Sequence, residues 1–316
     1  MEIVITDGYT LNPGDLDWSE IQALGNVHYH DRTAQEDIVN RCRYADIIVT
    51  NKTPINAQTL QQVTKLKLIA VTATGYNVID IAAAQAKRIA VCNVPAYGTD
   101  SVAQHAIALM LELTNHVGEN SRSVRQDEWS TAKDWCYSAS PLIELSGKVF
   151  GIVGFGRIGQ RTAAIAQALG MNVIFYSPSK KSFPAKQASL ETLFSESDFT
   201  SLHCPLTPDN VGFVNKTLLS LMKPTAFLIN TSRGQLINEM DLAAALTQGT
   251  LKGAALDVLS QEPPPHGHPL TGLKQCVITP HTAWLSVEAR GRILNTTIEN
   301  IKSFLAGSPQ NLVTVR

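Results

Sequence analysis

The stretch KVFGIVGFGRIGQRTAAIAQALG at residues 148–170 decides the fold of this 316-residue chain. An apolar run at 149–153 predicts a buried strand, and the alanine-rich segment 160–169 predicts a helix that Gly170 ends. Between them lies a G-x-G-x-x-G turn made of Gly154, Phe155, Gly156, Arg157, Ile158 and Gly159. The first glycine of this motif permits a tight turn, the second lets a pyrophosphate approach the backbone, and the third lets the helix pack on the strand. The sequence therefore predicts a dinucleotide-binding site, with a plain glycine-rich turn as the alternative.

The residue that follows the next predicted strand, 172–176, bears on which dinucleotide binds. A carboxylate at this place would bond the ribose hydroxyls and repel a 2′-phosphate. The sequence instead has Ser177, followed closely by Ser179, Lys180 and Lys181. In one interpretation these side chains hold the phosphate of NADP. In the other the lysines are only solvated and NAD binds with weaker ribose contacts. The expected cofactor is therefore NAD or NADP.

Strands and helices alternate through the rest of the chain, which predicts parallel sheets with helical crossovers. Apolar runs without polar alternation are typical of strands buried on both faces. We expect further strands at 2–6, 27–30, 46–50, 68–71, 89–92, 199–204, 226–230, 253–257 and 276–279, and further helices at 35–43, 57–63, 78–87, 215–222, 239–248 and 286–305. The fold class is α/β with doubly wound parallel sheets.

A long, largely apolar helix is expected to begin near Thr99. Ser101 and Gln104 have the spacing of a capping box at its start. The segment that follows, 118–146, is polar, and we expect it to be irregular.

Composition excludes several classes of function. The net charge of −1 gives no basic excess for nucleic acid or an anionic membrane. The five cysteines are scattered and form no C-x-x-C pair, so we expect a reducing compartment rather than a disulfide framework. We find no signal peptide and no apolar run of about 18 residues that would span a membrane. A cytoplasmic protein without nucleic-acid or membrane partners is expected.

Three polar clusters lie where predicted strands end, which is where open α/β sheets carry their sites. They are NTSRG at 230–234, DVLSQEP at 257–263 and TPHTAW at 279–284. Taken alone, Arg233 reads as a surface arginine, Glu262 as a solvated acid and His281 as a structural hydrogen-bonding residue. Together with the glycine turn they suit hydride transfer between a nicotinamide and a 2-oxo acid.

That chemistry requires the protein to bind a carboxylate, polarise a carbonyl and move a proton. Arg233 would direct two hydrogen bonds onto the substrate. His281 would protonate the new alkoxide and act as the base in the reverse direction. Glu262 would orient the imidazole and favour its charged form. Reduction needs the protonated histidine, so we expect it to fade as the pH rises, and oxidation to show the opposite trend.

These residues resemble the D-isomer-specific 2-hydroxyacid dehydrogenases, and the resemblance covers essentially the whole chain. The matching motifs are NKTPI at 51–55, TATGYNVID at 72–80, VGFGRIG at 153–159, HCPLTPDN at 203–210, NTSRG at 230–234, DV…EP at 257–263 and PHTAW at 280–284. Within the family the chain looks most like the glycerate dehydrogenase and hydroxypyruvate reductase group, on account of NVPAYGTDSVAQHAIALML at 93–111 and PLIELSGKVFGIVGFGRIG at 141–159.

The resemblance implies roles for individual residues. It implies Arg233, Glu262 and His281 as the catalytic set. The implied substrate contacts are Asn51, Lys52, Thr74, Gly75, Arg233, His281 and Trp284. Together with the glycine turn it gives as cofactor contacts Thr99, Val102, Gly154, Gly156, Arg157, Ile158, Gly159, Ser177, Ser179, Lys180, His203, Cys204, Pro205, Thr231, Ser232, Arg233, Asp257, His281 and Ala283, with Asp257 on the nicotinamide amide. Related formate dehydrogenases carry glutamine at the position of Glu262, so the acid argues against formate oxidation.

The family also implies the domain organisation. Residues 1–97 and 287–316 would form a flavodoxin-like substrate domain, and 98–286 a Rossmann domain that binds NAD(P). A cleft between the two would close over the substrate and exclude water. A homodimer is usual in such enzymes. Trp135 and Tyr137 are candidates for closing the substrate pocket, in their own subunit or in a neighbouring one.

Two other classes of function stay open as alternatives. A dinucleotide-sensing scaffold or corepressor on the same fold can keep the Arg-Glu-His set. A metal enzyme would use His266 and His268, but no carboxylate or cysteine cluster accompanies them, and a metal site needs about 3–4 ligands. We therefore expect no metal and interpret 266–268 as a polar loop.

Overall fold

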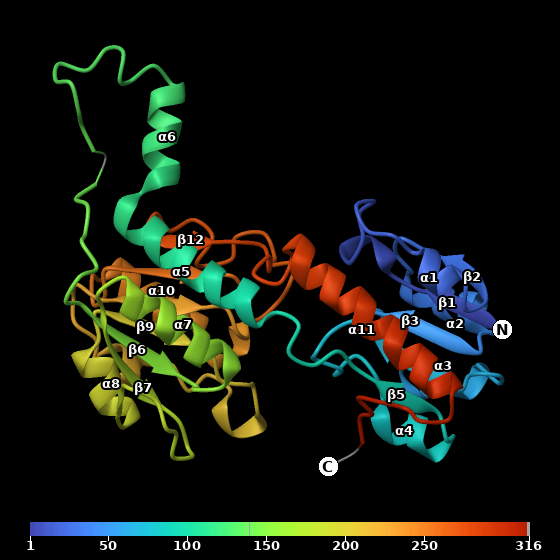
Figure 1. The fold of residues 1–316 in the computed structure, drawn as a ribbon. Helices are drawn as coiled ribbons and strands as arrows, with labels where there is room; N and C mark the ends of the chain where they lie inside the picture. Colours follow the sequence, from blue (N-terminus) through green and yellow to red (C-terminus); the bar gives the residue numbers. More distant parts are fainter. Residues whose placement is uncertain (139, 315–316) are drawn as a thin grey trace. The chain divides into compact units, whose positions relative to one another are not determined.

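The computed structural model describes residues 1–138 and 140–314, and it divides into two units (Figure 1). Unit 1 comprises Met1–Tyr97 and Leu285–Arg316, and unit 2 comprises Gly98–Trp284. The second boundary lies two residues before the expected one at 286/287. Each unit is a parallel sheet between helices, which confirms the expected α/β class. Among the described residues, no helix is both long and apolar enough to cross a membrane.

Unit 1 is built on a five-stranded parallel sheet in the order β2-β1-β3-β4-β5, the order of flavodoxin-like folds. Its strands are β1 (Glu2–Ile5), β2 (Asn26–Tyr29), β3 (Ile47–Thr50), β4 (Leu68–Val71) and β5 (Ala90–Cys92). Its helices are η1 (Gly8–Thr10), α1 (Ser19–Gln22), η2 (Gln35–Asp37), α2 (Ile38–Cys42), α3 (Ala57–Gln62), α4 (Ile81–Ala86) and α11 (Val287–Leu305). All five strands were expected, with each end within one residue.

The central strands of unit 1 are apolar on both faces, so helices cover both. On one face α11 packs on the strands through Leu294, Ile298 and Ile301. On the other face α2 and α3 supply Ile38 and Leu60 to a second core cluster. Burying both faces requires a helix layer on each, as the run of β-branched residues predicted.

Unit 2 has a seven-stranded parallel sheet in the order β12-β11-β10-β9-β6-β7-β8. Its strands are β6 (Val149–Val153), β7 (Asn172–Tyr176), β8 (Lys186–Gln187), β9 (Phe199–Leu202), β10 (Phe227–Asn230), β11 (Gly253–Leu256) and β12 (Cys276–Ile278). Its helices are α5 (Thr99–Asn115), α6 (Val117–Arg125), α7 (Arg157–Ala168), α8 (Leu190–Glu196), η3 (Pro208–Asn210), α9 (Lys216–Leu219), η4 (Gly234–Leu236) and α10 (Glu239–Thr247). The order reverses between β6 and β9, and such a switch point is where Rossmann sheets bind ligands.

Several details of unit 2 differ from expectation. The capping box at Ser101 and Gln104 is absent, so that prediction is wrong. Gly98 is the N-cap of α5 without a side-chain bond, and the Ser101 hydroxyl donates to the carbonyl of Ala283 at 2.6 Å. A tertiary acceptor therefore takes the hydroxyl that the local pattern assigned to the cap. The short strand β8 and the helix α8 were not expected at all.

The segment 118–146 is not wholly irregular, because α6 occupies Val117–Arg125. Its sequence, VGENSRSVR, has no apolar periodicity that would have predicted a helix. Figure 1 shows α6 and the segment after it projecting away from the sheet of unit 2. The segment folds back on the helix, since the hydroxyls of Tyr137 and Ser123 lie 2.5 Å apart. We call residues 117–138 the arm.

Candidate active site

The glycine turn shows why each glycine is needed. Gly154 has φ +93°, and a Cβ added to it would lie 2.4 Å from the amide nitrogen of Cys204. A Cβ on Gly159 would lie 2.3 Å from the carbonyl oxygen of Gly154. A Cβ on Gly156, in contrast, would meet no atom within 4 Å. The fold itself therefore requires Gly154 and Gly159, whereas Gly156 leaves open space where a pyrophosphate would approach.

The surroundings of the turn also fit a dinucleotide. Helix α7 begins at Arg157, earlier than expected, and no side chain caps its first turn. A helix start of this kind presents N–H groups to phosphate. Within the described residues, His203 Nδ1 and Thr231 Oγ1 are buried without a hydrogen-bond partner, and they follow the adjacent strands β9 and β10. Burial lowers the pKa of His203 to about 4, so the imidazole is neutral near pH 7.

Ser177 directly follows β7, as expected, and its side chain is buried. The Gln187 amide donates to the carbonyls of Ser177 at 2.8 Å and of Ser179 at 3.3 Å, which fixes this turn. Lys180 and Lys181 are exposed beside it. No carboxylate follows β7 directly, and contact between these residues and a 2′-phosphate stays a prediction.

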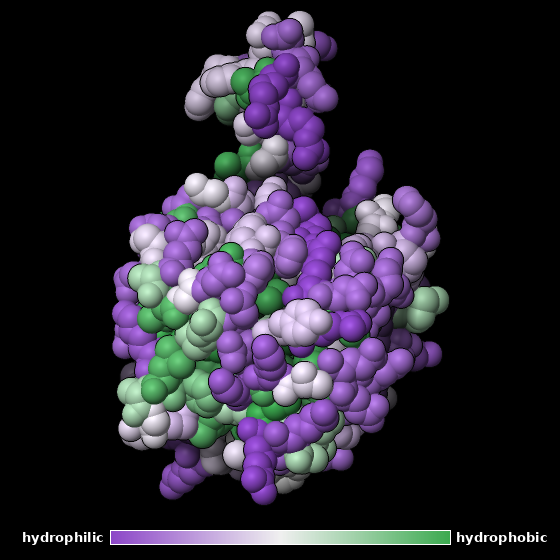
Figure 2. Space-filling model, turned by 90° about the vertical axis from the view of Figure 1, so that its right-hand side faces the viewer, coloured by the Kyte–Doolittle hydropathy of each residue, from purple (hydrophilic) through white to green (hydrophobic). Residues whose placement is uncertain are grey.

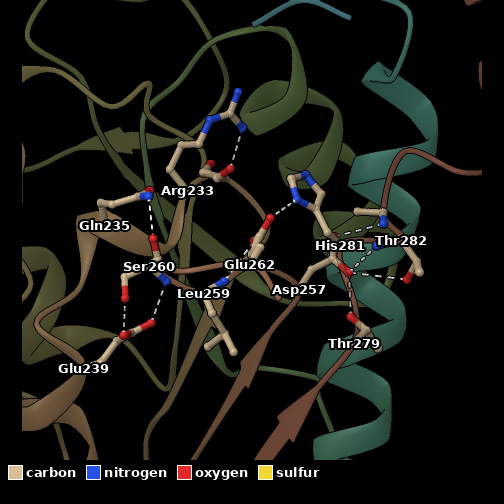
Figure 3. A network of polar contacts seen from close by, with 12 residues as sticks. Arg233, Gln235, Glu239, Asp257, Leu259, Ser260, Glu262, Thr279, His281 and Thr282 are labelled. Carbon is tan, nitrogen blue, oxygen red and sulfur yellow. Dashed lines mark hydrogen bonds and ion pairs between the residues drawn. The ribbon is translucent and has the colours of Figure 1, made fainter. Parts of the chain in front are cut away.

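Arg233, Glu262 and His281 each follow a strand of unit 2 at the carboxyl edge of its sheet (Figure 3). Strands β10, β11 and β12 are neighbours, so the structure brings the three loops together. His281 Nδ1 lies 2.6 Å from Glu262 Oε2. The other oxygen, Glu262 Oε1, accepts from the amide of Leu259 at 3.0 Å. The carboxylate is thus fixed between the loop backbone and the imidazole, and Nε2 is the ring nitrogen turned away from it.

The turn that carries His281 depends on Asp257. His281 has φ +53°, a conformation that non-glycine residues rarely adopt, and its amide donates to the carbonyl of Asp257 at 2.8 Å. The Asp257 carboxylate accepts from the amides of Thr282 at 2.8 Å and Ala283 at 2.9 Å, and from the hydroxyl of Thr279 at 2.6 Å. These contacts stabilise the turn on both sides of His281.

Asp257 is fully buried, yet it stays ionised. Burial alone would raise the pKa of its carboxyl, but hydrogen bonds from His105, Thr279, Ala283 and Thr282 outweigh burial and lower the pKa below its ordinary value. The part of His105 in this network was not expected from the sequence. Contact between Asp257 and a nicotinamide amide stays a prediction.

The guanidinium of Arg233 is exposed, and Nη1 donates to the carbonyl of Ser232 at 2.7 Å. Asn230 holds the turn, because its side chain donates to the carbonyl of Arg233 at 2.9 Å and accepts from the amide of Ser232 at 2.9 Å. The Ser232 hydroxyl in turn donates to the carbonyl of Leu202 on β9. An exposed guanidinium on a backbone that hydrogen bonds hold in place is suited to binding an anion.

The other expected cofactor contacts are spread around the same edge of unit 2. Thr99 and Val102 lie in the first turn of α5, and Pro205 follows β9 directly after Cys204. Ala283 is buried beside Asp257, and Trp284 follows it. Burial raises the pKa of the Cys204 thiol to about 11, which keeps it protonated and unreactive near neutral pH.

The expected substrate contacts in unit 1 follow the adjacent strands β3 and β4. Asn51 is buried and donates to the carbonyl of Thr72 at 2.9 Å, and the Thr74 hydroxyl donates to the carbonyl of Val94 at 2.8 Å. Lys52 is exposed, and Gly75 follows Thr74 at the same edge. The structure therefore places all four at the carboxyl edge of the unit 1 sheet.

Asp7 is a residue of this edge that sequence reasoning missed. Its carboxylate accepts from the backbone amides of Asn51 at 2.8 Å, Lys52 at 2.5 Å and Thr53 at 2.9 Å. It thereby fixes the turn after β3. Its position just after β1 was the available signal, because parallel strands bring their carboxyl ends to one edge.

The loop 266–268 was interpreted as polar, and its two histidines lie in different surroundings. His266 is exposed, but His268 is only 8% exposed and its Nε2 lies 3.2 Å from Glu239 Oε2. No sequence pattern predicts this contact, because 29 positions separate the two residues.

A Rossmann unit with an Arg-Glu-His set at the carboxyl edge of its sheet is the arrangement of a dinucleotide-dependent dehydrogenase. The model of the family described as "D-isomer specific 2-hydroxyacid dehydrogenase, NAD binding domain" matches residues 107–283. The chain belongs to this family, and it is an NAD(P)-dependent D-2-hydroxyacid dehydrogenase.

Relatives agree with this assignment. A hydroxypyruvate reductase of Blautia hydrogenotrophica is 46% identical over 99% of both chains. A glycerate dehydrogenase of Methylorubrum extorquens is 41% identical over 90% of both chains. Among solved structures, the D-lactate dehydrogenase of Escherichia coli matches with a TM-score of 0.87 at 26% identity, over 99% of this chain and 100% of that one. An acyclic imino acid reductase in complex with NADPH and D-Arg matches with a TM-score of 0.86 at 33% identity, with the same coverage.

Proposed function

We propose that this enzyme reduces hydroxypyruvate or glyoxylate with NAD(P)H, giving D-glycerate or glycolate. The single observation that carries the proposal is the 2.6 Å contact between His281 Nδ1 and Glu262 Oε2 at the edge that also bears Arg233. The names of the two curated relatives quoted above support the substrate class.

The bound nicotinamide supplies the hydride when it is reduced and accepts it when it is oxidised. Arg233 binds the carboxylate and the carbonyl oxygen of the substrate with a planar pair of donors. His281 gives its Nε2 proton to the developing alkoxide, and Glu262 stabilises the charged imidazole through Nδ1. In the oxidation of the hydroxy acid, the neutral imidazole takes the proton back.

Unit 1 is proposed as the substrate domain. Backbone amides at Thr74 and Gly75 would bind the substrate carboxylate, with Asn51 and Lys52 nearby and Trp284 of the other unit as a further contact. Unit 2 is proposed as the NAD(P)-binding domain, with Ser177, Ser179 and Lys180 meeting a 2′-phosphate when NADP binds.

The test is the loss of reduced-nicotinamide absorbance with the purified protein. Hydroxypyruvate, glyoxylate, pyruvate and 2-oxoglutarate are each offered with NADH and with NADPH. We expect turnover of hydroxypyruvate or glyoxylate, and a loss of about 10²–10⁴-fold in His281→Ala, the usual range for general acid catalysis. Tight dinucleotide binding without turnover of any 2-oxo acid would instead favour the sensing scaffold or corepressor.

A homodimer is also proposed, and the arm supports it. Trp135 is 86% exposed and Trp129 is 52% exposed, and apolar side chains that gather on an exposed surface mark interaction sites. The knob at the top of Figure 2 is the arm, and apolar patches interrupt its hydrophilic surface. A second copy of the chain would cover these patches.

The five cysteines are free thiols, in keeping with a cytoplasmic location.

Trp135→Ala tests whether the arm forms the dimer contact and whether Trp135 helps to close the substrate pocket. We expect a weaker dimer in analytical ultracentrifugation and a changed ratio of kcat/KM for hydroxypyruvate over glyoxylate. An unchanged substrate preference would count against a role in closing the pocket, and a monomeric wild-type protein would count against the dimer. Leu142→Ala, at another exposed apolar residue outside the arm, is the control.

A further inference from the structure

A buried hydrogen bond between a histidine and a glutamate lies beside the loop that carries Glu262, and none of the roles above uses it. Glu239 is the first residue of α10, and its side chain is 13% exposed. His268, whose side chain is 6% exposed, approaches it with Nε2 at 3.2 Å. The amide of Leu270 donates to His268 Nδ1 at 3.4 Å, so in the neutral ring Nε2 carries the proton and donates to Glu239. The imidazole thus has a defined orientation.

Glu239 holds the loop that carries Glu262. Its Oε1 accepts from the amide of Ser260 at 2.7 Å, and its Oε2 accepts from the hydroxyl of the same residue. Gln235 reaches this loop from η4 and donates to the carbonyl of Ser260 at 2.7 Å. Both polar groups of the Ser260 backbone are therefore fixed by side chains, two residues before Glu262 (Figure 3).

The same loop is in backbone contact with the turn that carries Arg233. A Cβ added to Gly234 would lie 1.9 Å from the carbonyl carbon of Leu259 and 2.3 Å from the amide nitrogen of Ser260. Leu259 also donates its amide to Glu262 at 3.0 Å. A shift of Leu259 or Ser260 would consequently move both the Glu262 carboxylate and the turn at Arg233.

We propose that Glu239, oriented by His268, is a positioning residue for the reaction. It fixes Ser260 and thereby sets the place of Glu262 relative to Arg233 and His281. A glutamate is needed because three donors converge on it: the amide and hydroxyl of Ser260, and His268 Nε2. Glutamine offers one acceptor oxygen, and its amide group would face the donor of His268. This inference rests on the proposed roles of Arg233, Glu262 and His281.

The kinetic test compares Glu239→Gln, Glu239→Ala, His268→Ala and His268→Gln with the wild-type enzyme. Glu191→Gln is the matched control, because Glu191 also lies in the first turn of a helix of unit 2, α8. We expect kcat for 2-oxo acid reduction to fall about tenfold in Glu239→Ala and less in Glu239→Gln, since a lost charged hydrogen bond costs about 1.5–3 kcal/mol where the group is fully engaged. Dinucleotide affinity is expected to stay unchanged. His268→Gln keeps a donor toward Glu239 and is expected to recover most of the activity that His268→Ala loses.

The split between kcat and KM separates positioning from a general loss of structure. A displaced Glu262 orients the imidazole of His281 less well, so we expect kcat to fall in Glu239→Gln while KM for the 2-oxo acid stays close to that of Glu191→Gln. Amide hydrogen exchange provides a readout independent of turnover, with faster exchange expected at Ser260 in Glu239→Gln.

Wild-type kcat together with unchanged exchange at Ser260 in Glu239→Gln would overturn the inference. If Glu239→Ala does not fold, Glu239→Gln and the two His268 variants decide. An inactive wild-type enzyme would refute the proposed function, whereas an active wild type with unaffected variants would refute only the positioning role.

Discussion

The glycine turn and the Arg233–Glu262–His281 set lie in the same unit, but their geometry arises in different ways. The turn consists of consecutive residues, its geometry requires that Gly154 and Gly159 have no side chain, and Gly156 leaves open space beside it. The proposed catalytic set is gathered from three loops and depends on further side chains, such as Asp257 behind His281 and Glu239 behind Glu262. A binding site made of backbone is therefore recognised locally, whereas a site made of side chains depends on supports elsewhere in the chain.

The largest expected effect is on the glycine turn, the site that is formed by backbone. Gly156→Val fills the open space at the turn, and we expect affinity for NADH and NADPH to fall on the order of 100-fold, equivalent to losing one or two charge-assisted hydrogen bonds. Isothermal titration calorimetry measures this. Gly272→Val is the control, since a Cβ there also meets no atom within 4 Å. Equal affinity in Gly156→Val and the wild type would show that the pyrophosphate does not approach this glycine.

Glu262→Gln tests the Arg233–Glu262–His281 set without disturbing the glycine turn. The amide keeps the shape of Glu262 but removes the charge opposite His281 Nδ1, so we expect kcat for reduction to fall about 10- to 100-fold. Stopped-flow single-turnover kinetics at several pH values measure the step, and dinucleotide affinity serves as the internal control. If dinucleotide affinity falls as much as kcat, the glycine turn and the Arg233–Glu262–His281 set do not act independently.

Asp257→Asn tests the support behind His281 through its pH dependence. The folded-state pKa of Asp257 is lowered, because hydrogen bonds from His105, Thr279, Ala283 and Thr282 outweigh the opposing effect of burial. Its contribution to stability is therefore present above the unfolded pKa of about 3.9 and is lost as the pH falls through the folded pKa.

We expect Asp257→Asn to lower the free energy of unfolding near pH 7 by about 1–3 kcal/mol, with the difference shrinking below pH values of about 4. Urea unfolding at pH 7 and at about pH 3 measures it, with the exposed Asp134→Asn as the control. A difference that is constant across this range would mean that ionisation of Asp257 does not stabilise the turn.

The smallest expected effect concerns the choice of cofactor. Ser177→Asp places a carboxylate after β7, and we expect the ratio of KM for NADPH to KM for NADH to rise about tenfold through repulsion of the 2′-phosphate. Lys180→Ala should raise KM for NADPH alone. A ratio that neither variant changes would show that this turn does not contact the phosphate.

The sequence predicted the two sheets because their signals are local. Apolar runs indicate buried strands, and these runs alternate with helical segments along the chain. All of the long strands were therefore located. The glycine turn was found for the same reason. Helix α6 was missed because its residues are mostly polar and lack periodicity, and the cap at Ser101 was misplaced because its hydroxyl has a distant acceptor.

The supports of the site were beyond prediction for a physical reason. His268 and Glu239 meet only once the loop after β11 has folded against α10, and Asp7 reaches Asn51 only once β1 and β3 pair. Neither the periodicity nor the composition of the sequence indicates such contacts. Motifs name Arg233, Glu262 and His281, but no motif names the residues that hold them in place.

The discontinuity of unit 1 has a consequence for the order in which the protein is made. One face of its sheet, with Ile3, Ile5 and Val49, is covered by α11, which lies at residues 287–305. During synthesis the five strands of this sheet therefore leave the ribosome long before the helix that buries them. Unit 2 is uninterrupted and can fold in the meantime, as domains generally do. The early strands expose an apolar face throughout that interval, and a nascent chain of this design depends on protection from premature association until its last helix emerges.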